Sequence, residues 1–170
     1  MKDLAAGLSA AQAGDTVILR AGSYWQIAPL VSGAAGRPVT IRSYEGEKPT
    51  IASAGAVGIS MDNKAYITIE GLSFSQVGGF GHIYDCNNIL IRNCSFSGSI
   101  FSGTTGALKI ARSTYCKVLN SSFRQGASDL LILQDHADRN IIDGNIFDTA
   151  RHGCASSEGW RVQQVKVLTG

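Results

Sequence analysis

Basic side chains recur at matched spacing along this chain, and they are the groups that could do chemistry. Lys109 and Arg112 each carry a cation that could neutralise a carboxylate, and His82 could accept a proton because imidazole titrates near neutral pH. His82 and Lys109 are 27 residues apart, and Ser60 precedes His82 by 22. These separations predict a polar stripe that could hold an anion and move a proton. The alternative is an ordinary solvent-facing strand surface, which carries such residues in any soluble protein.

Further polar side chains are expected near the same stripe. Two of them stand near the end of the strand that begins with the histidine, expected over 82–85, and two others stand at the corresponding edge later in the chain. They could contact a ligand beside the three basic groups. The catalytic candidates are therefore His82, Lys109 and Arg112, and the substrate-binding candidates are Tyr84, Asp85, Asp135 and His136.

Aspartates at the ends of expected strands raise the question of a metal ion. Asp62, Asp85, Asp135 and Asp138 could supply oxygen ligands to calcium, which takes six to eight of them. No compact ligand motif accompanies these residues, and aspartates at strand ends commonly form turns. The sequence therefore assigns no metal site and no certain cofactor, and calcium stays open.

A repeated segment ending in phenylalanine sets the positions of these side chains. The segment 66–74 returns at 88–96, at 115–123 and, more weakly, at 139–147, with phenylalanines 22, 27 and 24 residues apart. Self-similarity at this period, with strand-like alternation, predicts a stacked β-solenoid in which each repeat is one rung. An antiparallel sandwich with coincidental phenylalanines is the alternative.

Equivalent positions of the rungs should stack about 4.8 Å apart. Two columns ahead of the phenylalanines are mostly apolar and should face inward, whereas the positions between them are mostly polar. Three residues before each phenylalanine stands a glycine or an asparagine, which enter the left-handed region most readily, so a sharp bend is expected there. The columns are Ile67, Ile89, Cys116 and Asn140; Ile69, Ile91, Val118 and Ile142; Gly71, Asn93, Asn120 and Gly144; and Phe74, Phe96, Phe123 and Phe147.

The two ends of the stack are expected to differ. Apolar residues recur at helical spacing before Gly14, so residues 1–14 should contain a helix that caps the core. We expect one all-β domain over 1–170, with six to seven rungs from residue 15 onward. The segment 165–170 fits the repeat but stops before its phenylalanine. The last rung is thus incomplete, which implies a fragment of a longer solenoid, or self-association or a partner subunit at this end.

Composition argues against several classes of partner. The net charge is +2 without a basic run, so nothing favours a nucleic acid. No stretch approaches 18 apolar residues, so no membrane span is expected. The N-terminus lacks an apolar signal core, which fits a cytoplasmic chain or a mature exported one, and we favour the second. No two cysteines have the spacing of metal ligands. Cys94 and Cys116 are expected in the core, whereas Cys86 stands near a turn.

The opening of the chain resembles a known family. Residues 10–24, AAQAGDTVILRAGSY, and GRPVTIR at 36–42 look like the start of secreted right-handed parallel β-helix proteins of the pectin-lyase-like superfamily. Within it, the alginate lyase and chondroitinase B family is the most similar group. The resemblance implies a right-handed parallel β-helix, secretion, and action on a polysaccharide, often by β-elimination at a uronic acid. The family's catalytic lysine and arginine and its calcium ligands come from later rungs, so none is carried over to this chain.

Three classes of function stay open. As an enzyme, the chain would be a polysaccharide lyase. As a binding module, it would stack outward aromatic side chains on sugar rings. As a structural element, it would form one stretch of a longer fibre or adhesin. The aromatic candidates for sugar binding are Tyr24, Trp25, Tyr44, Tyr66 and Tyr84.

Overall fold

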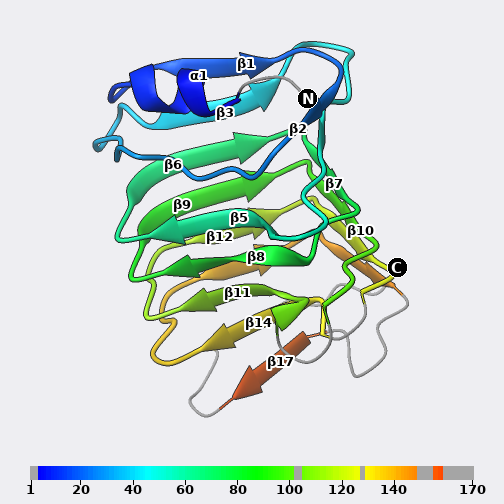
Figure 1. The fold of residues 1–170 in the computed structure, drawn as a ribbon. Helices are drawn as coiled ribbons and strands as arrows, with labels where there is room; N and C mark the ends of the chain where they lie inside the picture. The colour runs from blue at the N-terminus through cyan, green and yellow to red at the C-terminus, as the bar shows by residue number, and fades with distance from the viewer. Residues whose placement is uncertain (1–3, 102–104, 127–128, 149–154, 159–170) are drawn as a thin grey trace.

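The chain winds into a right-handed parallel β-helix whose strands stack in three sheets (Figure 1). The computed structural model describes residues 4–101, 105–126, 129–148 and 155–158, the last four as backbone alone. Each strand pairs in parallel with its counterpart one rung later. The fold therefore follows the column alignment of the sequence, and the predicted architecture is confirmed.

Every complete rung contributes one strand to each sheet. Sheet 1 contains β1 (Thr16–Leu19), β3 (Val39–Ser43), β6 (Ala65–Glu70), β9 (Asn87–Arg92), β12 (Lys117–Leu119) and β15 (Ile141–Asp143). Sheet 2 contains β2 (Ser23–Tyr24), β4 (Thr50–Ile51), β7 (Ser73–Ser75), β10 (Ser95–Ser97), β13 (Ser122–Arg124) and β16 (Ile146–Asp148). Sheet 3 contains β5 (Val57–Asp62), β8 (Gly79–Tyr84), β11 (Leu108–Ala111), β14 (Leu131–Gln134) and β17 (Ala155–Glu158).

The described residues contain slightly fewer complete rungs than the six to seven expected for the chain. Complete rungs of three strands run from β3 to β17, which gives five. A partial rung precedes them, in which β1 and β2 are followed by a single parallel bridge from Ile27 to Ile59. The incomplete rung expected at 165–170 lies outside the described residues.

The repeated phenylalanines form an aromatic ladder inside the solenoid. Strand pairing places Phe74, Phe96, Phe123 and Phe147 opposite one another in order. Their rings are stacked, with successive centroids 4.4, 4.6 and 5.1 Å apart. Phe80, which lies outside the repeat, packs its edge against the ladder at 5.5 Å from Phe96. The ladder fixes the register of the rungs, because a slip of one residue would turn each ring outward.

The predicted bend between sheets 1 and 2 is confirmed by its backbone angles. Gly71, Asn93, Asn120 and Gly144 have φ of 69°, 54°, 48° and 64°, all in the left-handed region. A second left-handed column, between sheets 3 and 1, was not predicted from the sequence. Its members are Asn63, Asp85, Arg112 and Asp135, with φ of 51°, 54°, 47° and 51°.

The helix α1 (Leu4–Ala10) covers the N-terminal end of the core, as predicted for residues 1–14. Leu4 and Leu8 are buried in the same apolar cluster as the ladder. The helix is followed by Gly14, whose φ of 99° suits glycine. None of the helices in the described part of the chain has the length and apolar character needed to cross a membrane.

Small polar and sulfur-containing side chains fill the corners of the core. Asn140 accepts a hydrogen bond from the Cys116 amide at 2.7 Å and donates to the Ser113 carbonyl at 3.0 Å. Cys94 and Cys116 are buried, as predicted, and burial raises the pKa of each thiol to about 12. Cys86 is also a buried free thiol, which settles a position that the sequence left open.

Candidate functional site

Sheet 3 carries the predicted stripe on its outer face. Strand pairing places Ser60 opposite His82, and His82 opposite Lys109, as the phenylalanine alignment predicted. The next position in this column is Ile132, which is buried, so the polar stripe ends after three rungs. A groove of about 290 Å³ lies over these strands. It is lined by Val57, Gly81, His82, Tyr84, Phe101, Thr105 and Lys109.

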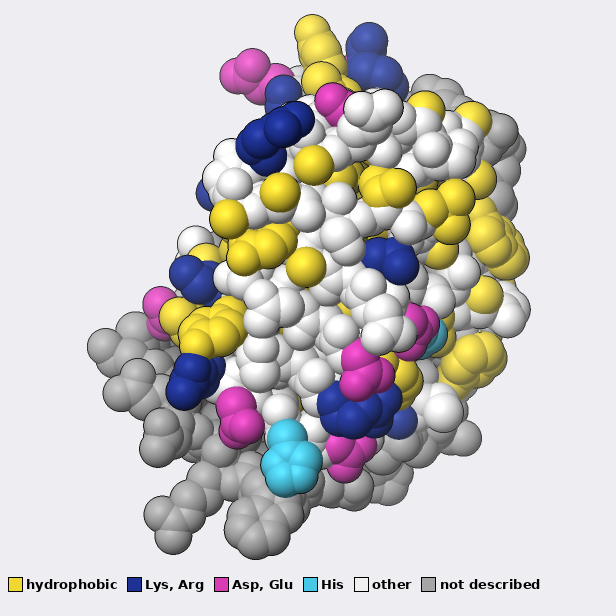
Figure 2. Space-filling view, turned by 90° about the vertical axis from the view of Figure 1, so that its left-hand side faces the viewer, with side chains coloured by type: hydrophobic (Ala, Val, Ile, Leu, Met, Phe, Trp, Pro, Cys, Tyr) yellow, Lys and Arg dark blue, Asp and Glu magenta, His cyan; other side chains and the backbone are white. Residues whose placement is uncertain are grey.

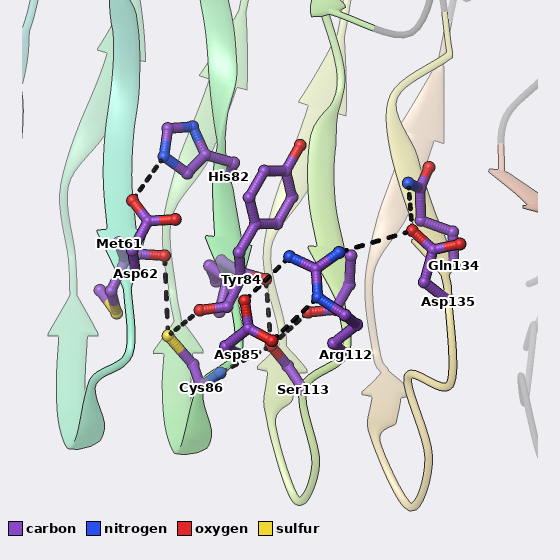
Figure 3. A network of polar contacts seen from close by, with 12 residues as sticks. Met61, Asp62, His82, Tyr84, Asp85, Cys86, Arg112, Ser113, Gln134 and Asp135 are labelled. Atoms are coloured by element: carbon purple, nitrogen blue, oxygen red, sulfur yellow. Dashed lines mark hydrogen bonds and ion pairs between the residues drawn. The ribbon is translucent and has the colours of Figure 1, made fainter.

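His82 is held in the groove by contacts with two strands. Its Nε2 lies 3.2 Å from Asp62 Oδ2 (Figure 3). The same nitrogen lies 3.2 Å from Ser60 Oγ, and both oxygens belong to residues of β5. Its ring also stacks on Tyr84 of β8, with the centroids 4.8 Å apart. Residues two apart on a strand share a face, which is why Asp62 joins Ser60 and Tyr84 joins His82. The side chain of His82 is 25% exposed, so a ligand in the groove can reach it.

Tyr84 and Lys109 complete the reactive side of the groove. Burial and the nearby charge of Asp62 raise the pKa of Tyr84, so its hydroxyl stays protonated near neutral pH. Lys109 is partly buried on β11. Across the described ranges, no carboxylate forms a salt bridge with Lys109, so its ammonium is available to an anion.

Arg112 joins two aspartates beside the groove. Its Nε and Nη2 donate to the two carboxylate oxygens of Asp85, each at 2.8 Å, and its Nη1 lies 3.8 Å from Asp135 Oδ2. The guanidinium carbon lies 5.5 Å from the ring centroid of Tyr84. Hydrogen bonding to Arg112 lowers the pKa of Asp85 from its usual 3.8. Figure 2 shows basic side chains among acidic ones on the side where sheet 3 passes into sheet 1.

The structure brings the predicted residues together in two sets. His136 belongs to neither, because it lies at an exposed, left-handed position with φ of 59°. Since the guanidinium of Arg112 is already engaged by two carboxylates, Lys109 is the better placed cation for a ligand. The groove set is His82, Tyr84 and Lys109, and the ion cluster is Asp85, Arg112 and Asp135.

Two residues of this site were not predicted from the sequence, Asp62 beside the groove and Phe101 in its lining. Asp62 was considered only for calcium or a turn, although its spacing of two from Ser60 places both side chains on one face. Phe101 belongs to the longer connection between β10 and β11, which lacks the repeat. Its ring packs so closely on Gly78 that a Cβ there would lie 2.3 Å from it. No sequence signal marks this contact.

Three of the four aspartates considered for calcium contact basic side chains. In the parts of the chain that the structure describes, no cluster of three or more His, Cys, Asp or Glu side chains could hold a metal ion. Asp85 and Asp135 contact Arg112, and Asp62 contacts His82. Calcium binding thus stays a prediction without a ligand set.

A larger groove of about 470 Å³ follows the bend between sheets 1 and 2. Its lining is mostly uncharged, with Asn93 and Asn120 at the bend and a row of serines beside it, of which Ser95 donates to Ser73 at 3.1 Å. Lys48 is its one titratable amine. This groove lacks the pairing of a base with a cation that the groove on sheet 3 has.

Comparisons with known proteins agree with the observed fold. Residues 41–167 match the family model described as right handed beta helix region. An alginate lyase from Paenibacillus sp. str. FPU-7 is similar over 84% of this chain and 54% of its own, with a TM-score of 0.73 and 19% identity. The pectate lyase Pel9A is similar over 84% of this chain and 40% of its own, with a TM-score of 0.63 and 16% identity. No curated protein matches the sequence. The chain therefore spans about half or less of the length of these two lyases, and the likeness at this identity is one of fold.

Proposed function

The chain belongs to the right-handed β-helix family, and on that premise we propose that it acts on a uronate-containing polysaccharide by β-elimination at the groove on sheet 3. The observation that carries the proposal is the placement of His82 beside Lys109 on adjacent strands of one groove. The sharing of the fold with an alginate lyase and a pectate lyase supports it. Secretion, as the resemblance implies, belongs to the same proposal.

The reaction would use each groove side chain once. The ammonium of Lys109 would pair with the uronate carboxylate, which makes the neighbouring carbon-bound proton more acidic. The imidazole of His82 would take that proton, a step in which a placed base contributes roughly 10²- to 10⁴-fold. The electrons of the broken C–H bond form a carbon–carbon double bond, and the glycosidic C–O bond breaks. The protonated hydroxyl of Tyr84 would supply a proton to the departing oxygen.

Polysaccharide binding without turnover is the second candidate. It is favoured by the presence of Tyr84 and Phe101 in the groove beside a cation, since aromatic rings and a cation suit an acidic sugar chain. Trp25 is 47% exposed and stays an aromatic candidate, whereas Tyr24 is buried and cannot stack on a sugar. Self-association at the C-terminal end, or membership of a longer chain, is compatible with either candidate.

Ultraviolet absorbance of unsaturated uronide products tests the proposal. The folded chain would be incubated with alginate, pectate and chondroitin, with and without calcium. We expect product with at least one substrate, a loss of roughly 100-fold or more in Lys109→Ala and in His82→Gln, and no change in Lys117→Ala. Lys117 is the matched control, because it is an exposed lysine on the outer face of sheet 1.

The negative outcomes separate the two candidates. Absence of product from every substrate, with the protein shown to be folded, would exclude the lyase. Retained binding of one polysaccharide that Lys109→Ala abolishes would then support the binding module. Equal loss of binding in Lys117→Ala and Lys109→Ala would exclude the groove as the binding surface.

A further inference from the structure

We infer that Asp62 is a positioning residue that holds the neutral imidazole of His82 with its proton on Nε2, so that Nδ1 is the atom that accepts the substrate proton. The assignment of the tautomer follows from the geometry around the ring. Its catalytic consequence rests on the proposed function.

Both oxygen neighbours of the ring lie at the same nitrogen. Asp62 Oδ2 and Ser60 Oγ are each 3.2 Å from His82 Nε2. An ionised carboxylate only accepts hydrogen bonds, so the nitrogen facing it must carry the hydrogen. In a neutral imidazole the other nitrogen then holds the lone pair. The two oxygens at one nitrogen also exclude a Ser–His–Asp relay, which needs the serine and the aspartate at opposite nitrogens.

The surroundings of the ring fix its orientation. Asp62 and Ser60 approach from β5 on one side, whereas Lys109 stands on β11 on the other side. Tyr84 stacks on the ring at an interplanar angle of 28°. Among the described residues of its own strand and of both neighbouring strands, the charged or titratable groups on this face are Asp62, Tyr84 and Lys109. Since β5 offers the acceptors and β11 the cation, the ring is held with Nε2 towards β5.

Nitrogen NMR of the histidine rings reads the tautomer without any need for activity. The sequence has three histidines, and the signals of His82 are those that disappear in His82→Gln. We expect a protonated Nε2 and an unprotonated Nδ1 for the neutral ring. Asp62→Ala should give a mixture of tautomers, whereas Ser60→Ala, which leaves Asp62 in place, should keep the single tautomer. Asp62→Asn should keep it as well, because the amide oxygen can accept the Nε2 hydrogen.

Kinetics on the substrate cleaved by the wild-type chain then tests the consequence. Asp62→Ala should lower kcat by about 10- to 100-fold, the cost of a misplaced reacting group, while KM changes by less than about twofold. Asp62→Asn should recover most of the loss, and circular dichroism should show all variants folded. A proton on Nδ1 of His82 in the wild-type chain would overturn the inference, as would an Asp62→Ala variant with unchanged tautomer and kcat. A proton on Nε2 without product from any substrate would overturn the proposed reaction and leave the tautomer assignment standing.

Discussion

Replacing Phe96 tests how the aromatic ladder stabilises the solenoid. Phe96 has no exposed surface, and its ring stacks on Phe74 at 4.4 Å and on Phe123 at 4.6 Å, with interplanar angles of 8° and 1°. A well-placed aromatic pair contributes about 0.5–1.5 kcal/mol beyond the burial of its area. Phe96→Leu keeps most of the apolar area but removes these two stacked pairs and the edge contact with Phe80, so the free energy of unfolding should fall by about 1.5–4.5 kcal/mol. Phe96→Ala also leaves a cavity and should lower the free energy of unfolding by about 3–5 kcal/mol.

The end of the ladder supplies the matched control. Phe147 is partly exposed and stacks on one neighbour, Phe123, at 5.1 Å. Phe147→Leu should therefore lower the free energy of unfolding by about 0.5–1.5 kcal/mol. Urea denaturation followed by circular dichroism measures all three variants. If Phe96→Leu is no more destabilising than Phe147→Leu, stacking along the ladder contributes nothing beyond burial, and the reasoning is wrong.

The buried thiols and one strand glycine give the remaining predictions. Because burial raises the pKa of Cys94 and Cys116 from 9.0 to about 12, their stabilising effect should be complete below pH 9 and be lost as the pH rises towards 12. Urea denaturation at pH 8 and pH 11 measures that loss of stability. A thiol reagent at pH 8 should modify both cysteines only after unfolding. Equal labelling rates with and without urea would contradict their burial. Gly81 has a φ of 152°, and a Cβ there would lie 2.6 Å from Ile59. Gly81→Ala should therefore lower the free energy of unfolding by about 1–3 kcal/mol. A Cβ at Gly55 meets nothing within 4 Å, so Gly55→Ala should change that free energy by no more than about 0.5 kcal/mol. Equal urea midpoints for the two variants would show that the strand adjusts to the added methyl group.

The sequence predicted the stacking of the rungs because the spacing within each repeat is constant. The stretch from the groove column to the ladder is fourteen residues in three successive rungs, so aligning the phenylalanines also aligned Ser60, His82 and Lys109. The bend at Gly71 and Asn93 was predictable because those residue types favour the left-handed region. Both predictions depend on backbone geometry, which repeats from rung to rung.

The contacts on the outer face were less predictable, because they depend on side-chain conformations and on connections of unequal length. The alignment placed Arg112 at the end of its strand, in the same column as Asp85 and Asp135. Its pairing with these two aspartates depends on the conformation of a long side chain that spans neighbouring rungs, and the alignment does not give that conformation. Phe101 reaches the groove from the connection between β10 and β11, which is longer than the corresponding connections β4–β5, β7–β8 and β13–β14. Arg112 at a φ of 47° also departs from the residue types that mark left-handed positions.

The ion pairs between rungs also bear on how the chain finds its stacking order during folding. Rungs with similar apolar interiors could stack on the wrong neighbour without a large loss of buried area. Along the second left-handed column, Asn63, Asp85, Arg112 and Asp135 alternate in charge after the first, neutral member. Omitting the rung of Arg112 would place Asp85 against Asp135, and like charges directly opposite one another are destabilising. The order of charges thus favours the native neighbour for the rungs of Asp85, Arg112 and Asp135, which their phenylalanines and isoleucines do not distinguish.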